Sequence, residues 1–217
     1  MSSERKIKNV IFDLDGTIID SANGINMAFN KAYSELYNSA DVFDIKDLVG
    51  PPIKDIFVKT CKEKDVNKVA SFIKMFQEKY DLTYYSDCTL YYGILSLLEF
   101  LKDTNIDCFI ATNKRLTPTT LILNHLNIDV YFKNIYTIDS TQNNYINKTE
   151  MVRAVLNREG LIASETILIG DTDHDQVAAQ ANNIEFIYAD HGYGNLINVE
   201  KELKKYLKSN SYISLIE

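Results

Sequence analysis

Two carboxylates separated by one residue follow an apolar run near the start of the chain. Residues 10–17 read VIFDLDGT, so Asp13 and Asp15 come directly after the run, before Gly16. Strand side chains alternate between faces, so both carboxylates can reach one ligand only if the chain leaves the strand near Asp13. Gly16 favours such a turn, because a residue without Cβ adopts turn conformations at little steric cost. Such a pair suits a hard divalent cation, with one carboxylate as nucleophile and the other as acid/base. Taken alone, the segment could also be a strand that ends in an Asp-Gly turn.

Polar residues also follow the later apolar runs of the chain. They are Thr112, Asn113 and Lys114 after residues 106–111, Lys148 after residues 135–138 and a polar loop, and Asp171–Asp175 after residues 166–169. In an open parallel sheet, ligands bind outside the carboxyl ends of the strands, so these residues are expected to form one set. The set offers carboxylates for a metal, and a hydroxyl and a cation for an anion. These groups meet the needs of phosphoryl transfer.

Each member of the set also has a purely structural interpretation. Thr112 could be an ordinary helix N-cap, Lys148 a solvated surface lysine, and Asp171–Asp175 the start of a helix that its dipole favours. All of these coincidences would have to occur together, which makes the structural interpretation of the whole set improbable.

The apolar runs predict an α/β fold. Strands are expected at residues 7–12, 106–111, 135–138, 166–169 and 185–188, with helices between the later runs, as in a parallel sheet with right-handed crossovers. One helix is expected to begin at Thr117 as N-cap with Pro118 at its first position. Another is expected over residues 149–159 before Gly160, and a third after Asp171.

Residues 21–87 interrupt this alternation with helical periodicity and no convincing strand. One apolar face comprises Ile25, Phe29, Ala32 and Leu36, and a second comprises Val66, Val69, Ile73, Phe76 and Tyr80. Between them Gly50-Pro51-Pro52 predicts a turn, and Pro52 can start a short helix over residues 53–60. We therefore expect a core made of residues 1–17 and 88–217, and a helical cap made of residues 18–87.

The order and spacing of these motifs resemble those of haloacid dehalogenase superfamily phosphatases with an inserted helical cap. Asp13-Leu14-Asp15-Gly16-Thr17 matches the first motif, Thr112-Asn113 the second, Lys148 the third, and Gly170-Asp171-Thr172 through Asp175 the fourth. The chain looks closest to the phosphoglycolate phosphatase-like branch, which includes pyrophosphatases and small-nucleotide phosphatases. Ser21, Gly50-Pro51 and Gly192-Tyr193-Gly194 support that placement. The resemblance implies a Rossmann-like parallel-sheet core with an α-helical cap.

The resemblance also implies a role for each matched residue. Asp13 would be the nucleophile, and Asp15 would protonate the leaving oxygen and later deprotonate water. Mg²⁺ would be held by Asp13, the Asp15 backbone carbonyl and Asp171, with Asp175 in support. Thr112, Asn113 and Lys148 would bind the phosphoryl group. Thr17 would orient the nucleophile's loop beside the phosphate, and Lys114 could also approach it.

Composition narrows the classes of partner. The 217 residues carry a formal charge of -7 and 46% hydrophobic residues, typical of a globular chain without a basic face for a nucleic-acid polymer. The N-terminal residues lack the apolar core of a signal peptide, and the apolar stretches are too short to span a membrane. Cys61, Cys88 and Cys108 lack metal-ligand spacing and are interpreted as reduced thiols, so we expect a cytoplasmic protein.

The leading functional prediction is a Mg²⁺-dependent phosphatase for a small phosphate monoester, resembling those for phosphoglycolate, pyrophosphate or nucleotides. A phosphomutase of the β-phosphoglucomutase type would use the same two carboxylates, and a non-catalytic binding or regulatory protein could keep the fold. Candidate contacts for the leaving group are Asn23, Gly50-Pro51-Pro52 and Lys54. Exposed tyrosines in the cap would suggest a homodimer surface. His125, His174 and His191 are given no role.

Overall fold

Strand β1 (Asn9–Phe12) lies at the centre of a parallel sheet in the computed structural model, which describes residues 7–140 and 145–189. Within those residues the strand order is β5-β4-β1-β6-β7. The other strands are β4 (Asp107–Thr112), β5 (Phe132–Thr137), β6 (Thr166–Gly170) and β7 (Glu185–Tyr188). The predicted α/β fold and its parallel sheet are therefore confirmed.

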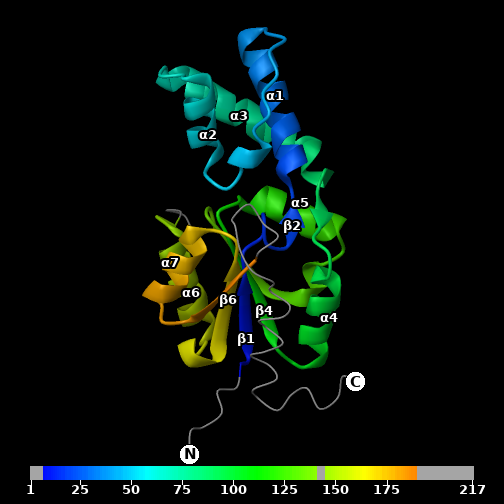
Figure 1. The fold of residues 1–217 in the computed structure, drawn as a ribbon, viewed down its shortest axis with the longest axis vertical. Helices are drawn as coiled ribbons and strands as arrows, with labels where there is room; N and C mark the ends of the chain where they lie inside the picture. The colour runs from blue at the N-terminus through cyan, green and yellow to red at the C-terminus, as the bar shows by residue number, and fades with distance from the viewer. Residues whose placement is uncertain (1–6, 141–144, 190–217) are drawn as a thin grey trace, which may run out of the picture.

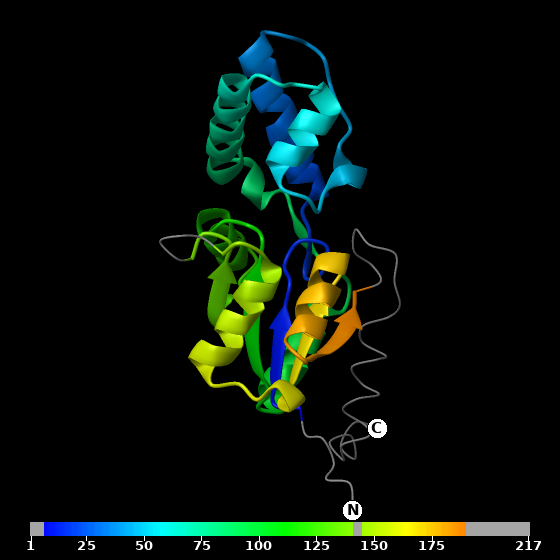
Figure 2. The ribbon, with the colours of Figure 1, turned by 90° about the vertical axis from the view of Figure 1, so that its left-hand side faces the viewer.

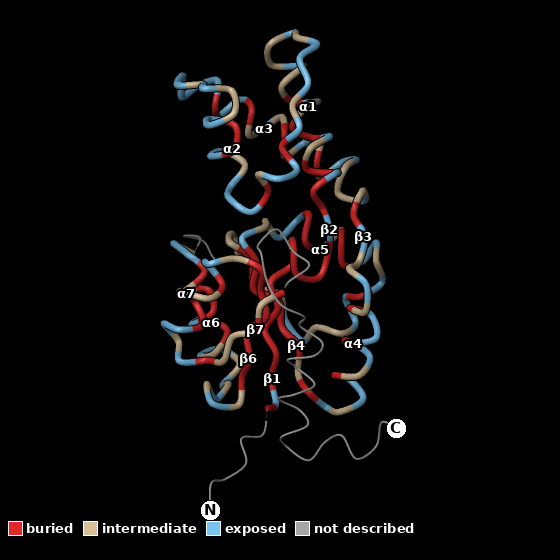
Figure 3. Tube along the Cα trace, in the orientation of Figure 1, coloured by how far each residue is buried: buried red, intermediate tan, exposed pale blue. Residues whose placement is uncertain are grey.

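Helices cover both faces of this sheet (Figure 1). Val10 and Phe12 of β1 belong to one apolar cluster with α4 (Ile94–Asp103) and α5 (Leu116–His125). Ile11 belongs to a second cluster with α6 (Lys148–Glu159) and α7 (Asp173–Ala181). Since successive side chains of a strand point to opposite faces, a continuous apolar run is what a sheet covered on both sides requires. Figure 3 shows the result as buried strands at the centre of the core.

The inserted segment forms a helical cap above the carboxyl ends of the strands (Figures 1 and 2). It consists of α1 (Ala22–Tyr37), α2 (Ile53–Cys61) and α3 (Val66–Leu82), with short 3₁₀ turns at Lys46–Leu48 and Tyr84–Ser86. Phe72 packs between Phe29 and Phe57, with ring centroids 5.0 and 3.8 Å apart. The cap thus has its own aromatic core, as two amphipathic helices predicted.

One residue of the predicted cap core is placed differently. Val66 is 79% exposed, so the expectation that it belongs to the apolar face of α3 is wrong. It is the first residue of the helix, where the N-cap Asp65 accepts hydrogen bonds from Asn67 and Lys68. Phe72 is instead fully buried on this face.

A short antiparallel pair joins the cap to the core. Strands β2 (Ile19–Asp20) and β3 (Thr89–Leu90) pair Ile19 with Leu90 and Asp20 with Thr89. Two residues are too few to show a period-2 pattern, so the sequence did not predict these strands. The division into residues 18–87 and the remaining residues stays a prediction.

Helix α5 begins one residue before the position that was expected for its N-cap. Its first residue is Leu116 and its N-cap is Arg115, so the prediction of Thr117 as N-cap is wrong. The reason is a distant acceptor: the Asp139 carboxylate, after β5, accepts a hydrogen bond of 2.8 Å from the Leu116 backbone N–H. A carboxylate 23 positions away supplies the cap that local sequence assigned to Thr117. The expected helices at residues 53–60 and 149–159 are confirmed within one residue at each end, and the helix expected after Asp171 begins at Asp173.

The tyrosines of the cap do not form an exposed surface. Tyr80 is 2% exposed and the other four in residues 18–87, Tyr33, Tyr37, Tyr84 and Tyr85, are half-buried. The cap tyrosines therefore do not support a homodimer surface, and the homodimer itself stays a prediction. Among the described residues, no helix is long and apolar enough to cross a membrane. Gly192-Tyr193-Gly194 and His191 lie outside the described residues.

Candidate active site

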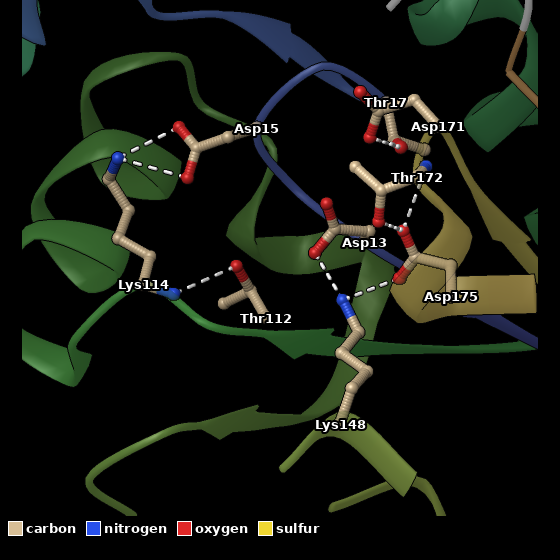
Figure 4. A network of polar contacts seen from close by, with 9 residues as sticks. All are labelled: Asp13, Asp15, Thr17, Thr112, Lys114, Lys148, Asp171, Thr172 and Asp175. Carbon is tan, nitrogen blue, oxygen red and sulfur yellow. Dashed lines mark hydrogen bonds and ion pairs between the residues drawn. The ribbon is translucent and has the colours of Figure 1, made fainter. Parts of the chain in front are cut away.

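The Asp13 carboxylate meets the ammonium of Lys148 at the carboxyl edge of the sheet. Asp13 follows β1 and Lys148 is the first residue of α6, and Nζ lies 2.5 Å from Asp13 Oδ1. The same Nζ lies 2.8 Å from Asp175 Oδ1 (Figure 4). The lysine side chain is only 4% exposed, so this is a buried ion triad rather than the solvated surface lysine considered above.

Three buried carboxylates gather around this point. Asp13, Asp171 and Asp175 each offer an oxygen, and these atoms lie within 4.8 Å of one another. Both oxygens of Asp175 have partners, because Oδ1 faces Lys148 and Oδ2 accepts hydrogen bonds from Thr172 N and Oγ1 at 3.2 and 2.6 Å. Asp175 is therefore suited to support the site, whereas Asp13 and Asp171 are suited to ligate a hard divalent cation.

Gly170 allows Asp175 to approach this closely. A Cβ at position 170 would lie 2.4 Å from Asp175 Cγ, well inside contact distance. Thr172 and Asp175 form a capping box at the start of α7, which fixes the Asp175 side chain against the end of β6. The glycine before Asp171 is thus explained by the packing of a carboxylate five residues beyond it.

Burial dominates the electrostatics of the nucleophile candidate. Burial, with repulsion from Asp175 and Asp171, raises the pKa of Asp13 to about 7. The nearby Lys148 ammonium lowers this pKa, but its effect is smaller than that of burial. Burial alone would lower the pKa of Lys148, but its contacts with Asp13 and Asp175 raise it instead. The cluster thus holds three carboxylates and one ammonium, which contacts two of them, and a divalent cation would offset the remaining negative charge.

Asp15 is held by a second buried lysine. Lys114 Nζ lies 2.8 and 3.1 Å from the two Asp15 carboxylate oxygens, and the Ser21 hydroxyl also donates to Asp15. In Figure 4 the Asp15 side chain is turned toward Lys114, while Asp13 is turned toward Lys148. The Lys114 ammonium also lies 4.7 Å from the ring centroid of Tyr80, in α3 of the cap.

Lys114 therefore has a different place from the one that sequence reasoning considered. Its position two residues after Thr112 indicated only that it could approach a phosphate. The structure shows it as the partner of the acid/base candidate, with a side chain 8% exposed. Its contact with Tyr80 could not be read from the sequence, because Tyr80 belongs to the inserted helices.

Of the remaining predicted phosphate ligands, two line a cavity and one does not. Thr112 and Asn113 line the cavity described below, and Thr112 Oγ1 accepts a hydrogen bond of 3.2 Å from the Lys114 backbone N–H. Thr17 is 1% exposed, is not among the cavity's lining residues and donates to Asp171 Oδ1 at 3.2 Å. Thr17 thus contacts a metal-ligand candidate, and its role in orienting the nucleophile's loop and in phosphate binding stays a prediction.

A cavity of about 250 Å³ separates these groups from the cap. Its core side includes Asp13, Asp15, Thr112, Asn113, Lys114, Arg115, Pro118, Lys148, Thr172, His174 and Asp175. Its cap side includes Ile25, Val49, Gly50, Pro51, Pro52, Ile53, Ile56, Phe76, Gln77 and Tyr80. The volume suits a small molecule, and both candidate catalytic carboxylates face it.

A family model for haloacid dehalogenase-like hydrolases matches residues 10–189 of this chain. That match spans β1 to the end of β7, and so includes the cap and all four motifs. The chain belongs to the haloacid dehalogenase-like hydrolase family.

Relatives of this hydrolase support the same assignment. It is 30% identical over 190 residues to a 5'-nucleotidase from Pseudomonas aeruginosa, covering 86% of this chain and 84% of the relative. It is 27% identical over 179 residues to the pyrophosphatase PpaX from Oceanobacillus iheyensis, covering 82% and 81%. A haloacid dehalogenase-like hydrolase from Streptococcus pneumoniae has a similar structure, with a TM-score of 0.76, 26% identity and coverage of 92% and 90%.

Two of the expected leaving-group contacts of this hydrolase lie elsewhere. Asn23 donates to Asp87 at 2.7 Å and to Met27, and neither Asn23 nor the exposed Lys54 is among the lining residues. The Gly50-Pro51-Pro52 turn does line the cavity, as predicted. Asp173 is exposed and accepts a hydrogen bond from Tyr188, and His174 lines the cavity rim.

Proposed function

We propose that this hydrolase is a Mg²⁺-dependent phosphatase of a small phosphate monoester, acting through an aspartyl-phosphate on Asp13. One observation carries the proposal: the Asp13 carboxylate faces a small cavity beside the buried Lys148 and within 4.8 Å of a second carboxylate suited to a cation. The relatives' names, a 5'-nucleotidase and a pyrophosphatase, support cleavage of a phosphate ester or anhydride.

In the first step an Asp13 oxygen forms a bond to phosphorus as the bond to the ester oxygen breaks. Asp15, which also lines the cavity, gives its proton to the departing oxygen, so the alcohol leaves neutral. Lys148 offsets the charge that Asp13 and the phosphoryl oxygens bring together, and Thr112 and Asn113 offer further donors. Asp13 and Asp171 would hold Mg²⁺, which supplies charge neutralisation for the phosphoryl group when bound.

In the second step water attacks phosphorus and gives a proton to Asp15. The bond between phosphorus and the Asp13 oxygen breaks, which releases inorganic phosphate, restores the Asp13 carboxylate and leaves Asp15 protonated as at the start. The cap lies over the strand ends that carry these residues, and thus can exclude bulk water while the alcohol leaves (Figure 1).

The test is release of inorganic phosphate and p-nitrophenol from p-nitrophenyl phosphate, with Mg²⁺ and with EDTA, by the wild type and Asp13→Asn. We expect turnover only with Mg²⁺, and a loss of about 10³-fold or more in kcat for the variant. Full activity of Asp13→Asn would overturn the mechanism. A hexose 1-phosphate in the same assay separates a phosphatase, which releases phosphate, from a mutase, which returns an isomeric sugar phosphate.

A further inference from the structure

The two sides of the cavity differ in chemistry. Among the residues that the structure describes, every charged one that lines the cavity comes from the core, as does His174: Asp13, Asp15, Lys114, Arg115, Lys148 and Asp175. The described cap residues that line it include no charged side chain. They offer aliphatic and proline side chains, the rings of Phe76 and Tyr80, and the amide of Gln77.

Each cation at the cavity already faces a carboxylate. Lys148 contacts Asp13 and Asp175 at 2.5 and 2.8 Å, and Lys114 contacts Asp15 at 2.8 Å. The third cation, Arg115, is paired with Asp81 of α3, with Nη2 2.6 Å from Oδ1. The described lining residues therefore leave no unpaired cation for a second anionic group of the substrate.

This distribution bears on the group that departs from phosphorus. The phosphoryl group must lie against Asp13, so the rest of the substrate extends toward the cap side. A carboxylate or a second phosphate there would lose hydration against apolar side chains without gaining a cation, which is strongly unfavourable. A flat apolar group would bury its faces against the Phe76 ring and Pro52, and its polar edge could hydrogen-bond to the Gln77 amide.

We propose that the leaving group of the substrate is uncharged and largely apolar with a polar edge, and that its chemical class is a nucleoside. The substrate is then a nucleoside monophosphate. The uncharged cap side of the cavity would favour this class over phosphoglycolate and pyrophosphate, whose leaving groups carry a negative charge. This inference rests on the proposed phosphatase function and specifies its substrate.

The experiment compares kcat/KM of the wild type for uridine and adenosine 5'-monophosphates with that for phosphoglycolate and pyrophosphate. We expect at least one nucleotide to exceed both anionic-leaving-group substrates by about tenfold or more. A higher value for phosphoglycolate or pyrophosphate would overturn the inference and leave the phosphatase function intact. Failure to hydrolyse any of the four or p-nitrophenyl phosphate would overturn both.

Two variants of helix α2 test the electrostatic reason. Ile53, half-buried at the cavity, becomes cationic in Ile53→Arg, which we expect to raise kcat/KM for phosphoglycolate relative to the better nucleotide by about tenfold. Val58 lies in the same helix, is 37% exposed and does not line the cavity, so Val58→Arg is the matched control and leaves the ratio unchanged. An unchanged ratio in a folded Ile53→Arg protein, or an equal shift in the control, would contradict the proposal.

Discussion

The Lys114 ammonium donates hydrogen bonds to both carboxylate oxygens of Asp15, at 2.8 and 3.1 Å. Lys114 lies two residues after the end of β4. Its ammonium also lies over the ring of Tyr80 in the cap helix α3. Ser21, directly before α1, donates to the same carboxylate. The orientation of the acid/base candidate is therefore linked to both the core and the cap.

Replacing Lys114 should impair the proton-transfer steps more than binding. We expect Lys114→Met to lower kcat by about 10- to 100-fold for a phosphate ester of an aliphatic alcohol, which needs a proton to leave. The loss should be smaller for formation of the aspartyl-phosphate from p-nitrophenyl phosphate, whose leaving group departs without one. Steady-state and single-turnover kinetics measure these two effects.

Lys114→Arg serves as the conservative variant, because its planar fork can also bind both oxygens of a carboxylate. It should recover part of the lost kcat. Lys54→Met, on an exposed cap position, is the matched control and should behave as the wild type. Equal losses for both types of ester in Lys114→Met would contradict a role in positioning Asp15.

The core and much of the site were predictable because their signals are local. Continuous apolar runs identify strands that are buried on both faces, and the residues directly after them must meet at one edge of a parallel sheet. Asp13, Lys148, Asp171 and Asp175 lie together for that reason. Contacts set by tertiary structure were not predictable: Asp139 begins α5, Thr17 contacts Asp171, and Tyr80 reaches Lys114 from another part of the chain.

Gly170→Ala should destabilise the protein. The added Cβ would lie 2.4 Å from Asp175 Cγ, so the α7 N-terminus or the carboxylate must move, at a cost of about 1–3 kcal/mol. Displacement of Asp175 would also remove a partner of Lys148 and lower activity. Urea unfolding measures the free energy, with exposed Val177→Ala in α7 as the control, expected within about 0.5 kcal/mol of wild type. A wild-type stability for Gly170→Ala would show that the close packing is absent.

Mg²⁺ should stabilise the folded protein through Asp13 and Asp171. At free Mg²⁺ of about 100 times Kd, the expected gain is about 2.7 kcal/mol, seen as a rise in Tm. Asp171→Asn should lose most of this rise, while Asp47→Asn, at an exposed cap position, should keep it. If Mg²⁺ raised the Tm of Asp171→Asn as much as that of the wild type, the ion would be binding elsewhere.

The hydrogen bond between Tyr37 and Glu63 should stabilise the folded cap, and this stabilisation should be lost in acid. The hydrogen bond from the Tyr37 hydroxyl, helped by the Asp65 and Lys64 backbone N–H groups, lowers the pKa of Glu63 from 4.5 to about 2. Because the folded-state pKa is lowered, the stabilisation is fully present above about pH 4.5 and is lost as the pH falls toward 2. Tyr37→Phe should therefore lower Tm at neutral pH and flatten its decline over that range.

Tyr33→Phe is the matched control for this effect, since its ring lies 4.7 Å from that of Tyr37 but its hydroxyl does not bond to Glu63. Thermal melts from pH 7 to pH 2 measure both variants. If Tm fell equally steeply with pH in Tyr37→Phe and in the wild type, the acid sensitivity would have to come from other carboxylates.

The most direct test of the central claim is to trap the phosphoryl group on Asp13. In Asp15→Asn, p-nitrophenolate can leave without a proton, but the group that activates water is missing. Mixing this variant with p-nitrophenyl phosphate and Mg²⁺ should give a burst of one p-nitrophenolate per protein. Acid-quenched peptide mass spectrometry should then find one phosphoryl group on Asp13. A phosphoryl group on another residue, or full turnover by Asp13→Asn without any protein-bound phosphoryl group, would contradict it.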